Sequence, residues 1–140
     1  MTDLQWLSVG LASTILLLVC TLVTGFRAKR KPHLVFVTLT VASLVFTIFR
    51  AEQLGSGYDL EQAGVITPIH LLIAKITTLA YLLPIITGYQ TWKNPAKKPL
   101  HRKSVYLVLF LTVTAFVTGT MMMMGAVPLD QAAQEAPAVD

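Results

Sequence analysis

The chain has 140 residues, enough for one domain, and 54% of them are apolar while only 13% are charged. A soluble domain carries about a quarter charged residues, so this composition points to a lipid environment. The net charge of +4 divides into basic loops and mildly acidic segments, which excludes a soluble nucleic-acid-binding module. The single cysteine, Cys20, lies in an apolar run and excludes an internal disulfide.

Four apolar segments are long enough to cross a membrane, which takes roughly 20 residues. We predict spans at about 4–26, 33–51, 66–89 and 100–124, within one domain of residues 1–128. The first segment lacks the basic start of a cleavable signal peptide, so we expect it to be retained. Residues 129–140 form a tail rich in Ala, Gln, Pro and acidic residues.

The positive charges predict the orientation of these spans. The first connection carries Arg27, Lys29, Arg30 and Lys31, and the third carries Lys93, Lys97, Lys98, Arg102 and Lys103. By the positive-inside rule, both connections face the cytoplasm. Short connections favour antiparallel neighbours. We therefore expect an all-α, four-helix, up-and-down bundle in a bacterial inner membrane, with both termini on the outer, periplasmic side.

Each of the three histidines lies in the first turn of a predicted span. His33 opens the second span, His70 the third and His101 the fourth, so His33 and His101 lie at one depth and His70 at the opposite end. The helical faces that continue from them are small and polar, and such faces point into a bundle of membrane helices. We therefore expect all three rings to face inward.

Two inward imidazoles on diagonal helices can hold a haem iron axially or bind a metal ion. This pattern makes His33 and His101 the candidate haem b ligands, with copper as a second option and His70 as an outer site or a structural residue. The competing interpretation treats the three rings as solvated or capping residues of a protein without a cofactor. A cytochrome that itself turns over electrons is disfavoured, because the outer end offers no second histidine pair.

Two further features are candidates for binding. Lys75 lies inside the third span and faces away from His70, so it either snorkels toward water or pairs with Glu52 or a partner protein. Met121–Met124 form a run near the outer end of the fourth span, and thioethers bind Cu(I). Consecutive helical residues point in different directions, which favours apolar packing for this run.

The second half of the chain has a recognisable pattern: His70-Leu-Leu-Ile-Ala, then Lys98-Pro-Leu-His101-Arg102-Lys103, then Val117-Thr118-Gly119. With His33, it resembles a small bacterial multi-helix membrane family of unassigned general function, over about residues 33–124. In that family histidines open successive spans, and one branch is implicated in maturing haem-copper terminal oxidases. The resemblance implies that His33, His70 and His101 are the functional residues.

These observations predict an accessory or assembly protein of a membrane electron-transfer complex, such as a terminal oxidase, with no independent catalytic activity. It would hold haem, or less favourably copper, through inward histidines. The alternative is a cofactor-free structural subunit that packs beside larger membrane proteins, with Lys75 as a partner contact. The sequence has no phosphate-binding glycine loop and no hydrolase triad in a water-accessible place.

Overall fold

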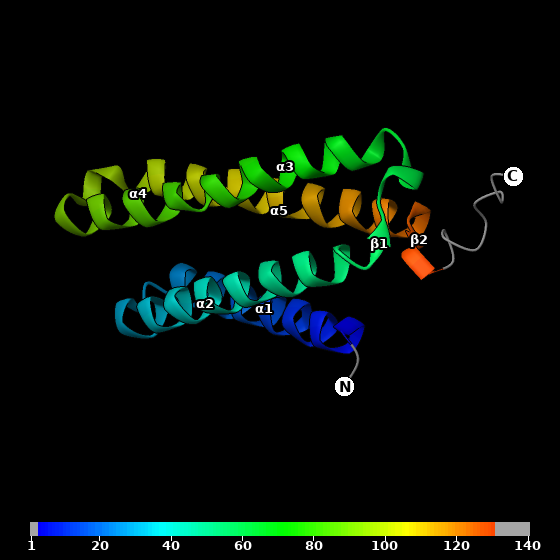
Figure 1. Cartoon of the computed structure of the whole chain (residues 1–140). Helices are drawn as coiled ribbons and strands as arrows, with labels where there is room; N and C mark the ends of the chain where they lie inside the picture. Colours follow the sequence, from blue (N-terminus) through cyan, green and yellow to red (C-terminus); the bar gives the residue numbers. More distant parts are fainter. Residues whose placement is uncertain (1–2, 131–140) are drawn as a thin grey trace, which may run out of the picture. The chain divides into compact units, whose positions relative to one another are not determined.

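A computed structural model describes residues 3–130 of the chain, and it is almost entirely helical (Figure 1). The long helices are α1 (Asp3–Phe26), α2 (Arg30–Gly55), α3 (Ile66–Ala80), α4 (Leu82–Lys93) and α5 (Lys98–Gly125). Because α3 and α4 follow each other directly, they form one span, and the structure contains four helices long and apolar enough to cross a membrane. The predicted all-α class and the four long apolar helices are confirmed. The third span extends further than predicted, to Lys93.

The chain divides into two compact units, Met1–Tyr58 and Asp59–Asp140. In the first unit α1 packs against α2, and in the second α3 and α4 pack against α5 (Figure 1). The second unit also contains the 3-10 turns η1 (Glu61–Ala63) and η2 (Pro95–Lys97). Two strands of two residues each, β1 (Tyr58–Asp59) and β2 (Val127–Pro128), form a small sheet. Most of the predicted tail, residues 131–140, lies outside the described part of the chain.

The turn between α1 and α2 closes in the Schellman arrangement. The Lys29 amide donates to the Thr24 carbonyl (3.1 Å), and the Ala28 amide donates to the Gly25 carbonyl (3.1 Å). Ala28 has a φ of 53°, in the left-handed region that favours glycine. This tight turn places the start of α2 directly beside the end of α1.

The interruption between α3 and α4 has a local cause. Pro84 has no amide proton to donate to the carbonyl of Ala80, four residues earlier, and its ring crowds that carbonyl. The helix is broken at Tyr81, whose hydroxyl bonds Thr112 of α5 at 2.8 Å. The residue at the proline-induced break therefore forms a hydrogen bond to α5.

The interfaces between paired helices are made of small and hydroxyl-bearing side chains. The buried polar residues are Thr14, Thr40, Thr47, Thr77, Thr87 and Ser104, whereas the buried apolar residues are only Ala80, Val108 and Met122 among those described. Large apolar side chains lie on the outside of the helices instead, with Phe110 at 69% and Leu16 at 65% exposure. Small residues inside and large apolar residues outside are typical of helices that associate in lipid. The structure therefore indicates a multi-pass membrane protein.

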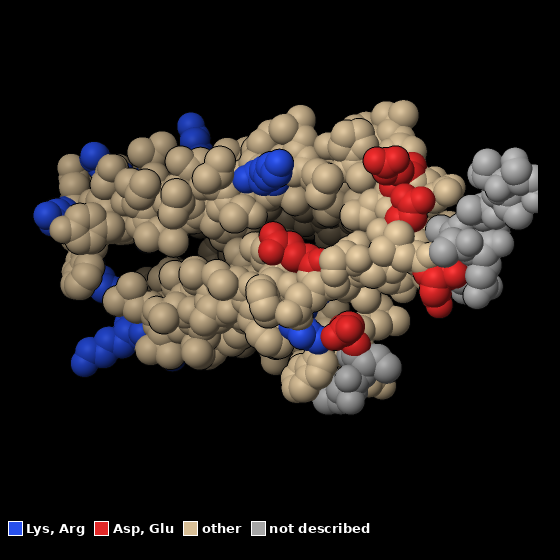
Figure 2. All heavy atoms as spheres, in the orientation of Figure 1, with Lys and Arg blue, Asp and Glu red and all other residues tan. Residues whose placement is uncertain are grey.

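Charged side chains separate along the helices of each unit. Lys and Arg gather at the α1–α2 turn and at the α4–α5 turn, which together hold nine of the eleven basic residues (Figure 2). Acidic residues lie toward the opposite end, as with Asp3 in the first turn of α1 and Glu61 in η1. This polarity supports the charge pattern used to predict orientation, and the side of the membrane that each end occupies stays a prediction.

Candidate functional site

The three histidines share one construction, which we call a histidine corner. In each corner a histidine in the first turns of one helix packs against a Thr-Gly dipeptide near the end of the antiparallel neighbour. The first corner is His33 with Thr24-Gly25, the second is His101 with Thr87-Gly88, and the third is His70 with Thr118-Gly119. The first corner belongs to the first unit and the other two belong to the second unit.

In the first corner, His33 of α2 reaches back to the last turns of α1. Its Nδ1 lies 3.0 Å from the carbonyl oxygen of Thr21 and 3.4 Å from the hydroxyl of Thr24. A Cβ atom on Gly25 would come within 3.1 Å of the ring carbon Cε1. Glycine at this position therefore gives the imidazole room to lie on the backbone of α1.

In the second corner, His101 of α5 faces α4 in the same way. Its Nδ1 lies 3.2 Å from the Thr87 hydroxyl, and that hydroxyl also lies 2.8 Å from Ser104 Oγ. A Cβ on Gly88 would lie 3.3 Å from the ring Cε1. Thr87 and Ser104 are buried, so this corner is a small polar cluster between two helices.

In the third corner, His70 of α3 faces the far end of α5. Its Nδ1 lies 3.1 Å from the Thr118 hydroxyl, and a Cβ on Gly119 would lie 2.9 Å from Cε1. This is the tightest of the three contacts between a ring and a glycine. The ring fits here only because position 119 has no side chain.

The second and third corners lie at opposite ends of their unit. Thr118 and His101 are both on α5, and at 1.5 Å rise per residue they are separated by about 26 Å along the helix axis. One metal ion or one haem iron therefore does not bind His70 and His101 of the same chain together. Within residues 3–130 no three His, Cys, Asp or Glu side chains form a metal cluster.

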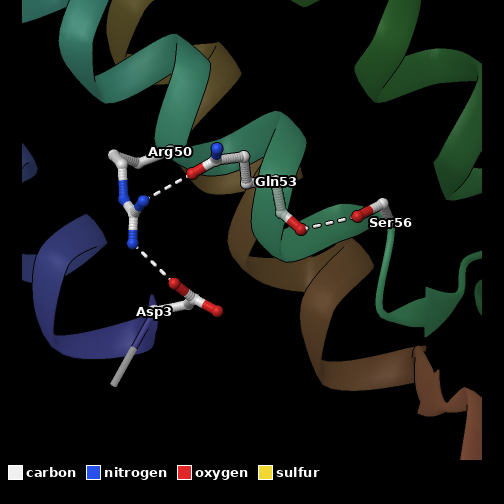
Figure 3. Close-up of polar contacts among 4 residues, drawn as sticks. All are labelled: Asp3, Arg50, Gln53 and Ser56. Atoms are coloured by element: carbon white, nitrogen blue, oxygen red, sulfur yellow. Dashed lines mark hydrogen bonds and ion pairs between the residues drawn. The ribbon is translucent and has the colours of Figure 1, made fainter. Parts of the chain in front are cut away.

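The position corresponding to a fourth corner, between the start of α1 and the end of α2, holds an ion pair instead (Figure 3). Arg50 of α2 donates to the Asp3 carboxylate and to the side-chain oxygen of Gln53. Asp3 is 66% exposed at its side chain, whereas the Arg50 side chain is 17% exposed. An ion pair with an exposed carboxylate therefore closes this end of the first unit.

The other candidate residues behave differently from the histidines. Lys75 is exposed on α3, and within residues 3–130 it has neither a hydrogen bond nor an ion pair. In the methionine run only Met122 is buried, whereas Met124 is 83% exposed. The four thioethers therefore point in different directions, as the helical period requires.

The three histidines were predicted from the sequence as candidate site residues, whereas their Thr-Gly partners were not. The dipeptide Thr-Gly occurs three times in the chain, once for each histidine, and this equal count is the signal that was available. Some residues of the helical faces that continue from the histidines are buried, namely Thr40, Thr47, Thr77, Ser104 and Val108, whereas Ala51 on the His33 face is exposed. The pairing of His33 with His101 stays a prediction.

Comparison with known proteins identifies no relative: no protein-family model matches the chain, and neither a curated protein nor a solved structure matches it. The resemblance based on the histidine pattern remains an expectation.

Proposed function

We propose that this protein binds haem b through the Nε2 atoms of its histidines and serves as an accessory or assembly protein of a membrane electron-transfer complex. The observation that carries the proposal is that all three rings bond a neighbouring helix through Nδ1. Histidines that bind metals use one ring nitrogen for the metal and donate the other ring N–H to a carbonyl or a similar acceptor. Copper is the second candidate cargo, since imidazole also suits copper.

The residue types at the corners fit this chemistry. Imidazole is the usual axial ligand of b-type haem iron in proteins. His33 and His101 each lie at the basic turn of their own unit, and this common feature makes them the proposed ligand pair. His70 lies at the other end of its unit, where it is a second site or a structural residue.

The proposed setting is a bacterial inner membrane, with the basic turns in the cytoplasm and both termini outside. The large apolar side chains on the outer faces suit lipid or a larger membrane protein, for example a terminal oxidase. Lys75 is the proposed contact with such a partner, because an ionisable group within a span is costly unless it is paired or reaches water.

The proposal is tested by titrating haem b into the purified protein in detergent and recording its visible spectrum. We expect a Soret band typical of bis-imidazole ligation. Replacing either proposed ligand, in His33→Ala or His101→Ala, should abolish this band or change its ligation state. His70→Ala is the matched control and should keep the wild-type spectrum. Absence of a Soret band, or an identical band in both ligand variants, would contradict the proposal.

A cofactor-free structural subunit is the second candidate, and a specific observation favours it. The Nδ1 bonds and the ring–glycine contacts already tie the helices of each pair together, which gives the histidines a structural role without any cofactor. In this case a photo-crosslinker at position 75 should capture a larger membrane protein, and the three His→Ala variants should lose stability without any spectral change.

A further inference from the structure

The hydroxyl groups of two corners determine which ring nitrogen carries the proton. Thr118 Oγ1 lies 2.9 Å from the carbonyl of Thr114 and 3.2 Å from the carbonyl of Ala115, both on its own helix. A carbonyl oxygen only accepts hydrogen bonds, so the single hydroxyl proton of Thr118 is donated to the backbone. The bond between Thr118 and His70 Nδ1 therefore needs a proton from the ring.

The hydroxyl of Thr87 is under the same hydrogen-bonding constraint as that of Thr118. This hydroxyl lies 2.7 Å from the Leu83 carbonyl, a separation that requires the hydroxyl proton between the two oxygens. With this proton used, the Thr87 hydroxyl can only accept further hydrogen bonds, so the proton in its bond to His101 comes from Nδ1. His33 reaches the same state without a hydroxyl, because its Nδ1 faces the Thr21 carbonyl directly at 3.0 Å.

A neutral imidazole carries one N–H, so a proton on Nδ1 leaves the lone pair on Nε2. The lone-pair nitrogen is the atom that can bind a metal or accept a proton. Free imidazole side chains in water prefer the opposite tautomer, with the proton on Nε2. The protein must therefore select the less common form at each corner.

We infer that Thr87 and Thr118 are positioning residues, which fix the proton of His101 and His70 on Nδ1 and so make Nε2 the ligating nitrogen. The tautomer is a property of the protein alone. The ligating role of Nε2 rests on the proposed haem function, and the experiment below separates the two.

The tautomer is measured by ¹⁵N NMR of the histidine rings in cofactor-free protein, at a pH where the rings are neutral. We expect a protonated Nδ1 and a bare Nε2 at His101 in the wild type. Thr87→Val keeps the side-chain shape and removes the acceptor, so His101 should move toward the Nε2–H form. Thr87→Ser restores a hydroxyl and should restore the wild-type signal. Thr91→Val is the matched control, because the Thr91 hydroxyl bonds only a carbonyl of its own helix.

The third corner offers an independent repeat of this measurement. Thr118→Val should move His70 part of the way toward the Nε2–H form, because the Ala115 main chain stays as a second partner of the ring. Thr120→Val should leave His70 unchanged, because the Thr120 hydroxyl bonds the carbonyl of Phe116. The first corner supplies a reference ring. His33 bonds a main-chain carbonyl, so Thr87→Val and Thr118→Val should leave its signal unchanged.

Haem titration gives the second readout. Loss of an outer hydrogen-bond partner typically lowers metal affinity 10–100-fold, so Thr87→Val should weaken haem b binding by roughly that factor while the control Thr91→Val leaves it unchanged. Wild-type rings that carry the proton on Nε2, or that keep it on Nδ1 in both Val variants, overturn the inference. If the NMR results are as expected and the wild type binds no haem, the proposed function fails and the positioning role of the threonines stands.

Discussion

A single missing methyl group decides how each histidine packs. At Gly119 an added Cβ would approach His70 Cε1 to 2.9 Å, closer than real side chains tolerate, so the ring would have to move. Alanine is a better helix former than glycine by about 1 kcal/mol, whereas overpacking costs about 1–3 kcal/mol. In a glycine-to-alanine substitution, helix propensity and overpacking therefore change the free energy of unfolding in opposite directions. Removing the histidine ring separates the two effects.

We predict that Gly119→Ala lowers the free energy of unfolding by about 1 kcal/mol in the wild-type background, because overpacking exceeds the gain in helix propensity. In the His70→Ala background the ring is absent, and the same substitution should stabilise the protein by about 1 kcal/mol. Denaturant unfolding in detergent measures both values. Gly57→Ala is the control, since its Cβ would meet only the Leu54 carbonyl at 3.5 Å. An equal effect of Gly119→Ala in both backgrounds would refute the ring contact.

At the scale of helices, the α1–α2 interface combines hydroxyl groups with one edge-to-face contact between Trp6 and Phe46. Thr14 Oγ1 lies 2.8 Å from Ser43 Oγ and 3.1 Å from Thr47 Oγ1. About two helical turns further along α1, the Thr21 hydroxyl bonds the Thr40 hydroxyl at 2.9 Å. Gly10 lies where an added Cβ would come within 2.8 Å of Thr47 Oγ1. The close packing of α1 on α2 therefore brings their hydroxyl groups within hydrogen-bonding distance, and these bonds in turn stabilise the close packing.

We predict that Thr14→Val destabilises the protein by about 0.5–1.5 kcal/mol, because interhelical hydrogen bonds in membrane proteins are worth roughly 0.6 kcal/mol each, with a maximum near 1.7. Thermal unfolding in detergent provides the measurement. Thr38→Val is the matched control, because the exposed Thr38 hydroxyl bonds only the Leu34 carbonyl of its own helix. The interpretation fails if the two variants lose the same amount of stability.

The α1–α2 turn provides a stabilising prediction at the same scale. Ala28 is held at a φ of 53°, which costs an L-residue with a side chain roughly 1–2 kcal/mol and costs glycine little. Ala28→Gly should therefore raise the free energy of unfolding by about 1 kcal/mol, after the extra chain entropy of glycine in the unfolded state is counted. Denaturant titration of the variant beside the wild type measures the change, and a decrease in stability would contradict the assigned turn conformation.

At the scale of the whole molecule, the four long helices were predictable from the sequence, because apolar runs of about 20 residues favour a helix long enough to cross a membrane. The break at Tyr81 was not predicted, because hydropathy does not register that Pro84 lacks an amide proton. The predicted end of the third span, at about residue 89, also falls short of the observed helix end at Lys93, because the polar residues after the apolar run continue the helix.

Of each histidine corner, the histidine could be predicted from the sequence, whereas its contact with the neighbouring helix could not. The helical period placed His33, His70 and His101 on small polar faces, because the face on which a residue lies depends only on the sequence of its own helix. Their contacts with Gly25, Gly119 and Gly88 depend on the register between two helices, which turn length and packing determine together. Periodicity of a single segment carries no information about this register.

The separation of charge along each unit leads to a prediction for the whole chain in its membrane. Basic residues concentrate at the α1–α2 and α4–α5 turns, and Lys and Arg near span ends are retained in the cytoplasm. In a Cys20→Ala background, a membrane-impermeant maleimide should label Ser56→Cys in intact spheroplasts. It should label Ala96→Cys only in inverted vesicles. Both positions are exposed, so accessibility within the protein does not bias the comparison. Labelling with the opposite sidedness would place the basic turns outside, and His33 and His101 would then face the periplasmic half of the membrane.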